Sequence, residues 1–155
     1  MDARQAAFVR GADTFFIAST HSERGADASH RGGRPGFVEV TSGGRMLTFP
    51  DYMGNRMFQT LGNLTANPHV GLLLVDWETG NTLQLTGRAQ IVWDTHAVRS
   101  RPGAERLVEV TVDTVHEHER AMPARWDLIE PYRRNPPVNP QGEQHGTDAA
   151  TRPVR

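Results

Sequence analysis

The sequence contains no cysteine and no lysine among its 155 residues. The absence of cysteine excludes disulfide bonds, thiolate metal sites and thiol catalysis. The absence of lysine means that all 17 basic residues are arginine. An anion site in this protein therefore uses arginine guanidinium groups or backbone N–H groups, because no side-chain ammonium group is available.

A strong net charge and long apolar runs are also missing. The formal net charge is −1, so no overall positive field attracts nucleic acid or an anionic membrane, and we expect neither as a partner. No stretch approaches the ~20 apolar residues that a membrane-spanning helix needs. The first residues, Met1 to Gln5, lack the apolar segment of a signal peptide. We therefore expect a cytoplasmic protein.

The composition that remains is that of a globular protein. Hydrophobic residues make up 37% and charged residues 23% of the chain. From residue 131 onward, five prolines stand among polar residues with almost no apolar side chain. We therefore expect one domain over residues 1–130 and a tail over residues 131–155 that is disordered or draped on the domain. From about Pro136 onward, we expect this tail to be dispensable for folding.

Six segments have the aromatic and β-branched residues, or the alternation of apolar and polar residues, that are typical of β-strands. They are residues 14–20, 37–40, 45–49, 70–77, 82–93 and 107–115. Residues 23–36 hold four glycines and three arginines, so we expect a loop there with at most one short strand. Gly87, inside the fifth segment, predicts a bulge or a barrel corner.

Two segments have helical character. Residues 3–10 are short and mildly amphipathic, which predicts one or two helical turns. In residues 56–66, Met57, Leu61 and Leu64 follow helical spacing, which predicts a helix of about three turns. Because most connections are short, we expect a mainly β fold in which antiparallel strands close into a small barrel, with one inserted helix and short flanking helical turns.

Two segments carry groups suited to an anion. Residues 29–36 combine glycines, which let backbone N–H groups approach closely, with guanidinium groups that match phosphate oxygens. An exposed arginine-rich loop is an equally good interpretation of this segment. Residues 49–56 run into the predicted helix, where Asn55 is a natural N-cap and Arg56 lies in the first turn. A plain capped helix whose arginine faces water is the simpler interpretation there.

Two further features have weaker functional interpretations. His116 and His118 have the spacing of a chelating pair, but no third ligand is specified. We therefore favour a solvated segment just past the last strand and predict no metal site. The rings of Trp77, Trp93 and Trp126 can stack on a planar cofactor, although such residues more often fill a core or an interface.

Several motifs, taken in order, together resemble one family. They are Phe-Phe-Ile-Ala at 15–18, the segments 29–38 and 49–56, Leu-Gly-Asn-Leu at 61–64, Asn-Pro at 67–68, Gly-Leu-Leu at 71–73 and Leu-Gln-Leu-Thr-Gly-Arg-Ala at 83–89. This set covers about residues 6–115 and is similar to the FMN-binding split-barrel family related to pyridoxamine 5′-phosphate oxidase. The resemblance implies a six-stranded antiparallel Greek-key split barrel, paired as a homodimer, with FMN in the groove between subunits.

The resemblance also implies which residues bind FMN. Arg56 takes the place of a phosphate-binding arginine, and Arg34 or Arg31 supplies a second guanidinium. The strand end at 49–51 lines the flavin, and polar side chains from the helix and the following strand add weaker contacts. The implied cofactor-binding residues are Arg31, Arg34, Phe49, Pro50, Asp51, Asn55, Arg56, Asn63, Thr82 and Gln84.

Two departures from the family pattern limit the expected activity. Met57 stands where pyridoxamine 5′-phosphate oxidases have a second basic residue, and their C-terminal arginine-rich signature is not recognisable here. We therefore expect an FMN-dependent oxidoreductase of unassigned small-molecule substrate, with a nicotinamide or oxygen as its second partner. The alternative is a protein on the same barrel that holds a flavin or haem without turnover. No residue is an obvious nucleophile or base, so we assign no catalytic residue.

Overall fold

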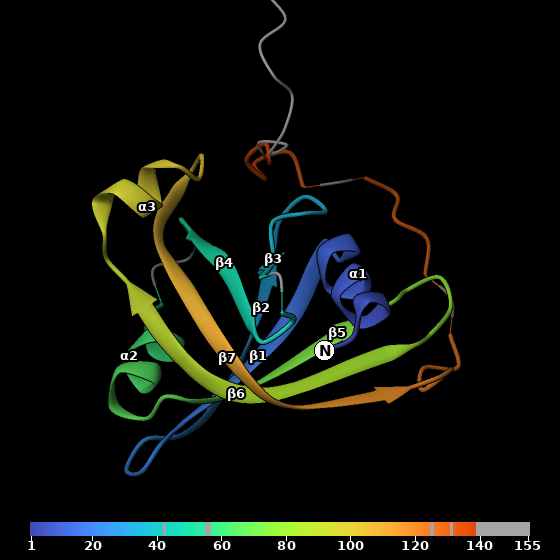
Figure 1. Ribbon diagram of the computed structural model, residues 1–155, viewed down its shortest axis with the longest axis horizontal. Helices are drawn as coiled ribbons and strands as arrows, with labels where there is room; N and C mark the ends of the chain where they lie inside the picture. Colours follow the sequence, from blue (N-terminus) through green and yellow to red (C-terminus); the bar gives the residue numbers. More distant parts are fainter. Residues whose placement is uncertain (42, 55–56, 125, 131, 139–155) are drawn as a thin grey trace, which may run out of the picture.

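The computed structural model describes residues 1–41, 43–54, 57–124, 126–130 and 132–138. Figure 1 shows a strongly curled sheet, with α1 towards the right of the view and α2 and α3 on the left. In chain order the elements are α1 (Ala3–Gly11), β1 (Thr14–His21), β2 (Gly25–Gly32), β3 (Glu39–Val40), β4 (Met46–Tyr52), α2 (Gln59–Ala66), β5 (His69–Val75), β6 (Thr82–Val92), α3 (Thr95–Arg99) and β7 (Ala104–His118).

All seven strands belong to one antiparallel sheet, in the order β2-β1-β5-β6-β7-β4-β3. Within the described residues the two edge strands, β2 and β3, do not pair with each other, so the barrel is split and not closed. The prediction of a mainly β, antiparallel fold is confirmed. The prediction of six strands is wrong, because the sheet has seven.

The additional strand is β2, eight residues long, which lies in the segment predicted to be a loop with at most one short strand. It pairs with β1 along its whole length, from Gly32 opposite Thr14 to Gly25 opposite His21. As an edge strand it has only exposed or half-buried side chains, so it lacks the alternating apolar residues that reveal a strand in a sequence. At the other edge, β3 has only two residues, whereas four were predicted.

The core fills the inside of the curled sheet. Inward-facing residues such as Ile17, Leu83 and Val110 are at most 1% exposed. Phe15 of β1 packs edge-on against Phe49 of β4, with ring centroids 4.9 Å apart. Because β1 and β4 are separated by three strands in the sheet order, this contact joins its two halves across the interior. Burial of a ring of this kind contributes about 1.5–3 kcal/mol.

The helix α2 starts at Gln59, three residues later than predicted, and its N-cap Phe58 makes no side-chain capping bond. The predicted N-cap Asn55 lies outside the described residues, as does Arg56. Buried polar contacts hold α2 on the sheet instead. Thr60 donates to Asp27 of β2 at 2.5 Å, and Asn63 donates to Ser19 of β1 at 3.2 Å.

The last strand is longer than predicted. β7 continues to His118, so His116 and His118 lie inside the strand and not just past it. Among the described residues, no group of three or more His, Asp or Glu side chains is placed to hold a metal ion. None of the described helices is long and apolar enough to cross a membrane.

We call residues 126–130, the end of the predicted domain, and residues 132–138, the described part of the predicted tail, the C-terminal strap (Figure 1, orange to red). The N–H of Trp126 donates to the carbonyl of Trp77 at 3.1 Å, and their rings meet edge to face. Further along, Pro136 lies beside Gly103, and Val138 packs against the core. Our expectation of a dispensable tail is therefore restricted to the residues after Val138.

Gly87 is the position where the fold depends most clearly on a glycine. The pairing of β6 with β7 shifts between Thr86 and Gly87, which confirms the predicted bulge. A Cβ at Gly87 would lie 2.2 Å from the carbonyl oxygen of Thr111, a backbone atom that cannot move aside alone. At Gly62, in α2, an added Cβ meets nothing within 4 Å.

We therefore predict opposite effects of the same substitution at these two glycines. Gly87→Ala should lower the free energy of unfolding by about 1–3 kcal/mol, because the strand must shift to relieve the overlap. Gly62→Ala, the matched control, should raise it by up to about 1 kcal/mol, because alanine favours a helix interior. Urea unfolding of both variants checks this, and an unchanged midpoint for Gly87→Ala would contradict it.

Candidate functional site

A cleft of about 1450 Å³ opens where the end of β2, the end of β4 and the C-terminal strap come together. Its basic side chains come from β2 and the loop that follows, and its large aromatic side chains come mostly from the strap and the β5–β6 turn. The residues that line it are Asp13, Thr14, His30, Arg31, Gly32, Gly33, Arg34, Pro35, Pro50, Tyr52, Met53, Gly54, Trp77, Glu78, Trp126, Asp127, Leu128, Glu130, Tyr132, Asn135 and Pro136.

Two of the predicted phosphate-binding residues, Arg31 and Arg34, line this cleft. Arg34 is exposed and forms no ion pair with any residue that the structure describes. The glycine between them has a packing role, because a Cβ at Gly33 would lie 2.3 Å from the ring of Phe37. The arginines therefore supply the chemistry of this segment, and Gly33 allows the chain to turn over the core.

Arg31 is held by a buried carboxylate. Its Nη1 lies 2.5 Å from Oδ1 of Asp51, whose side chain is only 6% exposed. The other oxygen, Oδ2, lies 3.3 Å from Nη1 of Arg106, a β7 residue directly opposite Asp51 in the β4–β7 ladder. Arg106 also donates to Glu105 at 2.5 Å. One carboxylate thus joins an arginine at the cleft to an arginine behind it.

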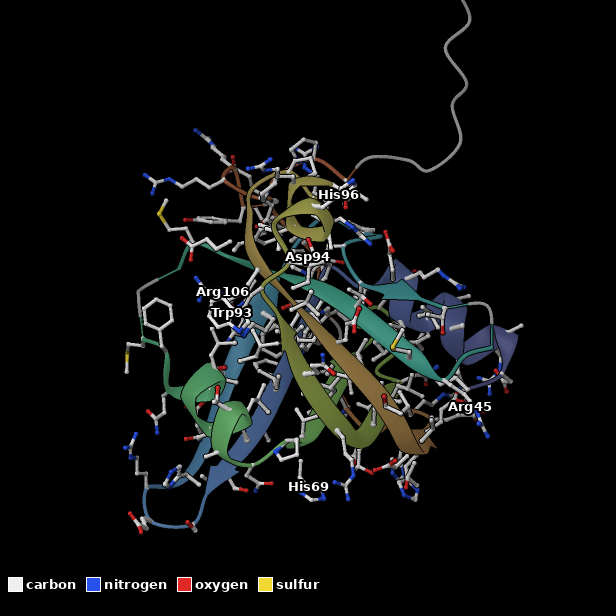
Figure 2. All side chains as sticks on the ribbon, turned by 60° about the vertical axis from the view of Figure 1, so that its left-hand side comes forward. Arg45, His69, Trp93, Asp94, His96 and Arg106 are labelled. Atoms are coloured by element: carbon white, nitrogen blue, oxygen red, sulfur yellow. The ribbon has the colours of Figure 1, made fainter. Side chains whose placement is uncertain are left out.

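The guanidinium of Arg106 lies between the sheet and two aromatic rings. Its central carbon is 5.2 Å from the ring centroid of Phe58 and 5.3 Å from that of Trp93. Figure 2 shows Arg106 beside Trp93, far from Arg45 at the other end of the barrel. Both rings are more than half exposed, so Arg106 is covered by side chains that themselves face solvent.

Burial raises the pKa of the Asp51 carboxyl above its usual value, and the nearby charges of Arg31 and Arg106 oppose that shift. Burial likewise raises the pKa of Tyr52, which lines the cleft, and the charge of Arg101 opposes this. The loss of hydration at the end of β4 therefore outweighs the attraction of the arginines for the ionised carboxylate.

Thr14 and His30 also line the cleft, although neither was predicted to be a site residue. The hydroxyl of Thr14 forms a short hydrogen bond with Nε2 of His30 and donates to the carbonyl of Arg31 at 3.2 Å. His30 lies on β2, so recognition of this strand would have placed it opposite Phe16 and near Thr14.

The other predicted cofactor-binding residues are distributed unevenly around this site. Pro50 lines the cleft, and Asp51 lies behind Arg31. Phe49, Asn63 and Thr82 are buried and do not line it, whereas Gln84 is exposed on β6, away from its lining. Contacts of these four residues with a cofactor remain a prediction, as do those of Asn55 and Arg56, which lie outside the described residues.

The raised pKa of Asp51 predicts a specific pH dependence of stability. The folded state binds this proton more tightly than the unfolded chain, so the contribution of Asp51 is most favourable at low pH and declines as pH rises through the raised pKa. Asp51→Asn stays neutral at every pH. Its free energy of unfolding should therefore rise relative to wild type as the pH increases through the raised pKa of Asp51. A relative fall, measured by urea unfolding, would show that the arginines dominate.

Comparison with known proteins places this geometry in a family. Residues 1–128 match the family described as Pyridoxamine 5′-phosphate oxidase. No curated protein matches the sequence. Among solved structures, a putative pyridoxamine 5′-phosphate oxidase from Lactobacillus delbrueckii gives a TM-score of 0.59 at 11% identity, over 75% of this chain and 93% of that one.

Two further solved structures share the fold. HupZ from Group A Streptococcus has a TM-score of 0.59 at 9% identity, over 77% of this chain and 95% of that one. The conserved hypothetical protein Rv2991 from Mycobacterium tuberculosis has a TM-score of 0.59 at 17% identity, over 78% of this chain and 86% of that one. At such identities these likenesses concern the fold alone. The family match over residues 1–128 covers most of the chain, which therefore belongs to the pyridoxamine 5′-phosphate oxidase family.

Proposed function

We propose that the cleft binds FMN and that the protein is an FMN-dependent oxidoreductase for a small molecule other than pyridoxamine 5′-phosphate. The observation that carries this proposal is the meeting of Arg31 and Arg34 with Pro50, at the strand end that the family resemblance assigns to the flavin. Membership of the pyridoxamine 5′-phosphate oxidase family supports a flavin as the ligand.

The residues of the cleft offer FMN a hydrogen-bond donor, flat apolar surfaces and sufficient space. The buried Nε of Arg31 has no hydrogen-bond partner among the described residues, and a ligand oxygen would satisfy it. Trp77, Trp126 and Tyr132 offer flat apolar surfaces to a ring system. The volume of about 1450 Å³ exceeds the roughly 300–1,000 Å³ of a typical small-molecule site, which leaves room for a substrate beside the cofactor.

In this proposal the protein binds and orients, and bound FMN supplies the hydride-transfer chemistry. Arg34 provides a charge that no described carboxylate neutralises, and Arg31 provides N–H donors that Asp51 holds in place. Arg56 is a third phosphate-binding candidate, on sequence grounds. The strap supplies part of the lining of the cleft.

The first test of the proposal is the loss of phosphate recognition. Arg34→Ala should weaken FMN binding roughly ten- to a hundredfold, because one charge-assisted contact is worth about 1.5–3 kcal/mol. Riboflavin has no phosphate, so its affinity should hardly change. Flavin fluorescence quenching, titrated with both ligands, measures the two affinities.

Arg45→Ala is the matched control, because this exposed arginine lies at the opposite end of β4 from Asp51 (Figure 2). Its affinities for FMN and for riboflavin should equal those of wild type. Equal losses of the two ligands in Arg34→Ala would mean that Arg34 does not hold the phosphate. Arg56→Ala, compared in the same way, tests the third arginine.

Turnover is tested separately from binding. Purified protein with bound FMN should show flavin absorption bands, and a nicotinamide donor should bleach them under anaerobic conditions. A stable flavin spectrum with every donor would indicate a flavin-binding protein without this activity. A Soret band in place of flavin bands would indicate haem.

We also propose that two copies of the chain form a homodimer, as the family resemblance implied. Large apolar side chains exposed on the single chain support an association, among them Phe58 at 53%, Trp93 at 66% and Ile129 at 98% exposure. Light scattering should therefore give about twice the mass of one chain at micromolar concentration. A monomer that still bound FMN would contradict an interfacial site.

A further inference from the structure

Arg106 is a charged residue in a buried position that the proposed FMN site does not explain. Its side chain is only 11% exposed, and it does not line the cleft. Burial of a guanidinium is unfavourable unless its N–H groups find acceptors. Arg106 donates to Glu105 and forms an ion pair with Asp51 at 3.3 Å, while its Nε has no hydrogen-bond partner among the described residues.

The contact with Asp51 fixes the orientation of that carboxylate. Asp51 and Arg106 are directly opposite each other in the β4–β7 ladder, so their backbones are already held together. Arg106 forms an ion pair with Oδ2 of the carboxylate, and Arg31 forms one with Oδ1. The hydrogen bond from Arg31 and the ion pair with Arg106 act on different oxygens, so together they favour the orientation of the carboxylate in which Oδ1 is directed at Arg31.

Besides its carboxylate partners, the guanidinium of Arg106 contacts two aromatic rings. The rings of Phe58 and Trp93 each lie within about 5.3 Å of its central carbon, a distance at which a guanidinium is attracted to an aromatic face. A lysine ammonium in its place would keep the charge but would lose the planar fork and the stacking. The position is therefore suited to arginine specifically.

We infer that Arg106 is a positioning residue for phosphate recognition: through Asp51 it holds the Arg31 guanidinium at the cleft, and so sets the preference for FMN over riboflavin without touching either ligand. This inference rests on the proposed function, because it assigns Arg31 to the phosphate. It goes beyond that function by naming the residue that prepares Arg31 before the ligand arrives, which lowers the cost of ordering Arg31 on binding.

The test is Arg106→Met, which keeps an unbranched apolar side chain and removes the guanidinium. Affinities for FMN and riboflavin are measured by fluorescence quenching, with folding checked by circular dichroism. FMN binding should weaken about five- to tenfold, within the range of couplings between residues of one network, and riboflavin binding should stay constant. Arg106→Lys should lose a smaller factor, because it retains the charge.

Arg101→Met is the matched control. Arg101 also pairs with a carboxylate, that of Glu39, and its side chain is 21% exposed, but it lies outside the Asp51 network. Its FMN-to-riboflavin ratio should not change. If Arg106→Met unfolds the protein, Arg106→Lys carries the test alone, and an unchanged ratio in that variant overturns the inference.

A double variant separates positioning from a general structural effect. If Arg106 acts through Arg31, then adding Arg106→Met to Arg31→Gln should not reduce FMN affinity further. Additive losses, or equal losses of FMN and riboflavin in Arg106→Met, overturn the inference. A loss in Arg31→Gln without one in Arg106→Met also overturns it but leaves the proposed function standing. No loss in Arg31→Gln or Arg34→Ala would overturn the proposed phosphate site itself.

Discussion

The ion pair between Arg31 and Asp51 is a polar contact that joins the two sides of this split barrel. Arg31 belongs to β2, at one edge of the seven-stranded sheet, and Asp51 belongs to β4, next to the other edge. No ladder hydrogen bonds join these edges within the described residues, so side chains must hold the opening. Inside the barrel, the apolar contact between Phe15 and Phe49 joins the two sides of the sheet. At the end of the barrel, the ion pair between Arg31 and Asp51 joins them.

This position explains how one pair of residues combines a structural role with the functional role that we propose for it. A pair that closes a split barrel must lie at the split, which is also where a ligand can enter. Isolated buried ion pairs are often no more stabilising than apolar residues of the same size, because their desolvation is costly. The raised pKa of Asp51 fits that balance. The pair is therefore better explained by what it presents to the cleft than by the stability that it adds.

Sequence patterns predicted the parts of the fold that depend on apolar periodicity. Strands such as β5 and β6 are buried on one face or both, which gives them a recognisable apolar pattern. Gly87 indicated a bulge because glycine inside a strand often marks a close backbone approach, here to Thr111. β2 was missed because an edge strand has little need of apolar side chains. The network around Arg106 was missed for another reason. It unites residues from β2, β4 and β7, and nothing in the spacing of these residues along the chain indicates that they meet.

The two arginines of the cleft differ in whether a carboxylate neutralises their charge. Arg31 and Arg106 are matched by Asp51 and Glu105, so this network of four is neutral overall. Arg31 therefore contributes little net charge, but its donors are already fixed. Arg34 has no carboxylate partner among the described residues and is exposed, so it contributes charge without fixed geometry. Tight binding of a phosphate needs both kinds of arginine. The attraction of an exposed, mobile guanidinium is screened by water and salt. A fixed but neutralised guanidinium offers oriented donors and leaves the charge of the phosphate uncompensated. The cleft combines the two in a segment of four residues, 31–34.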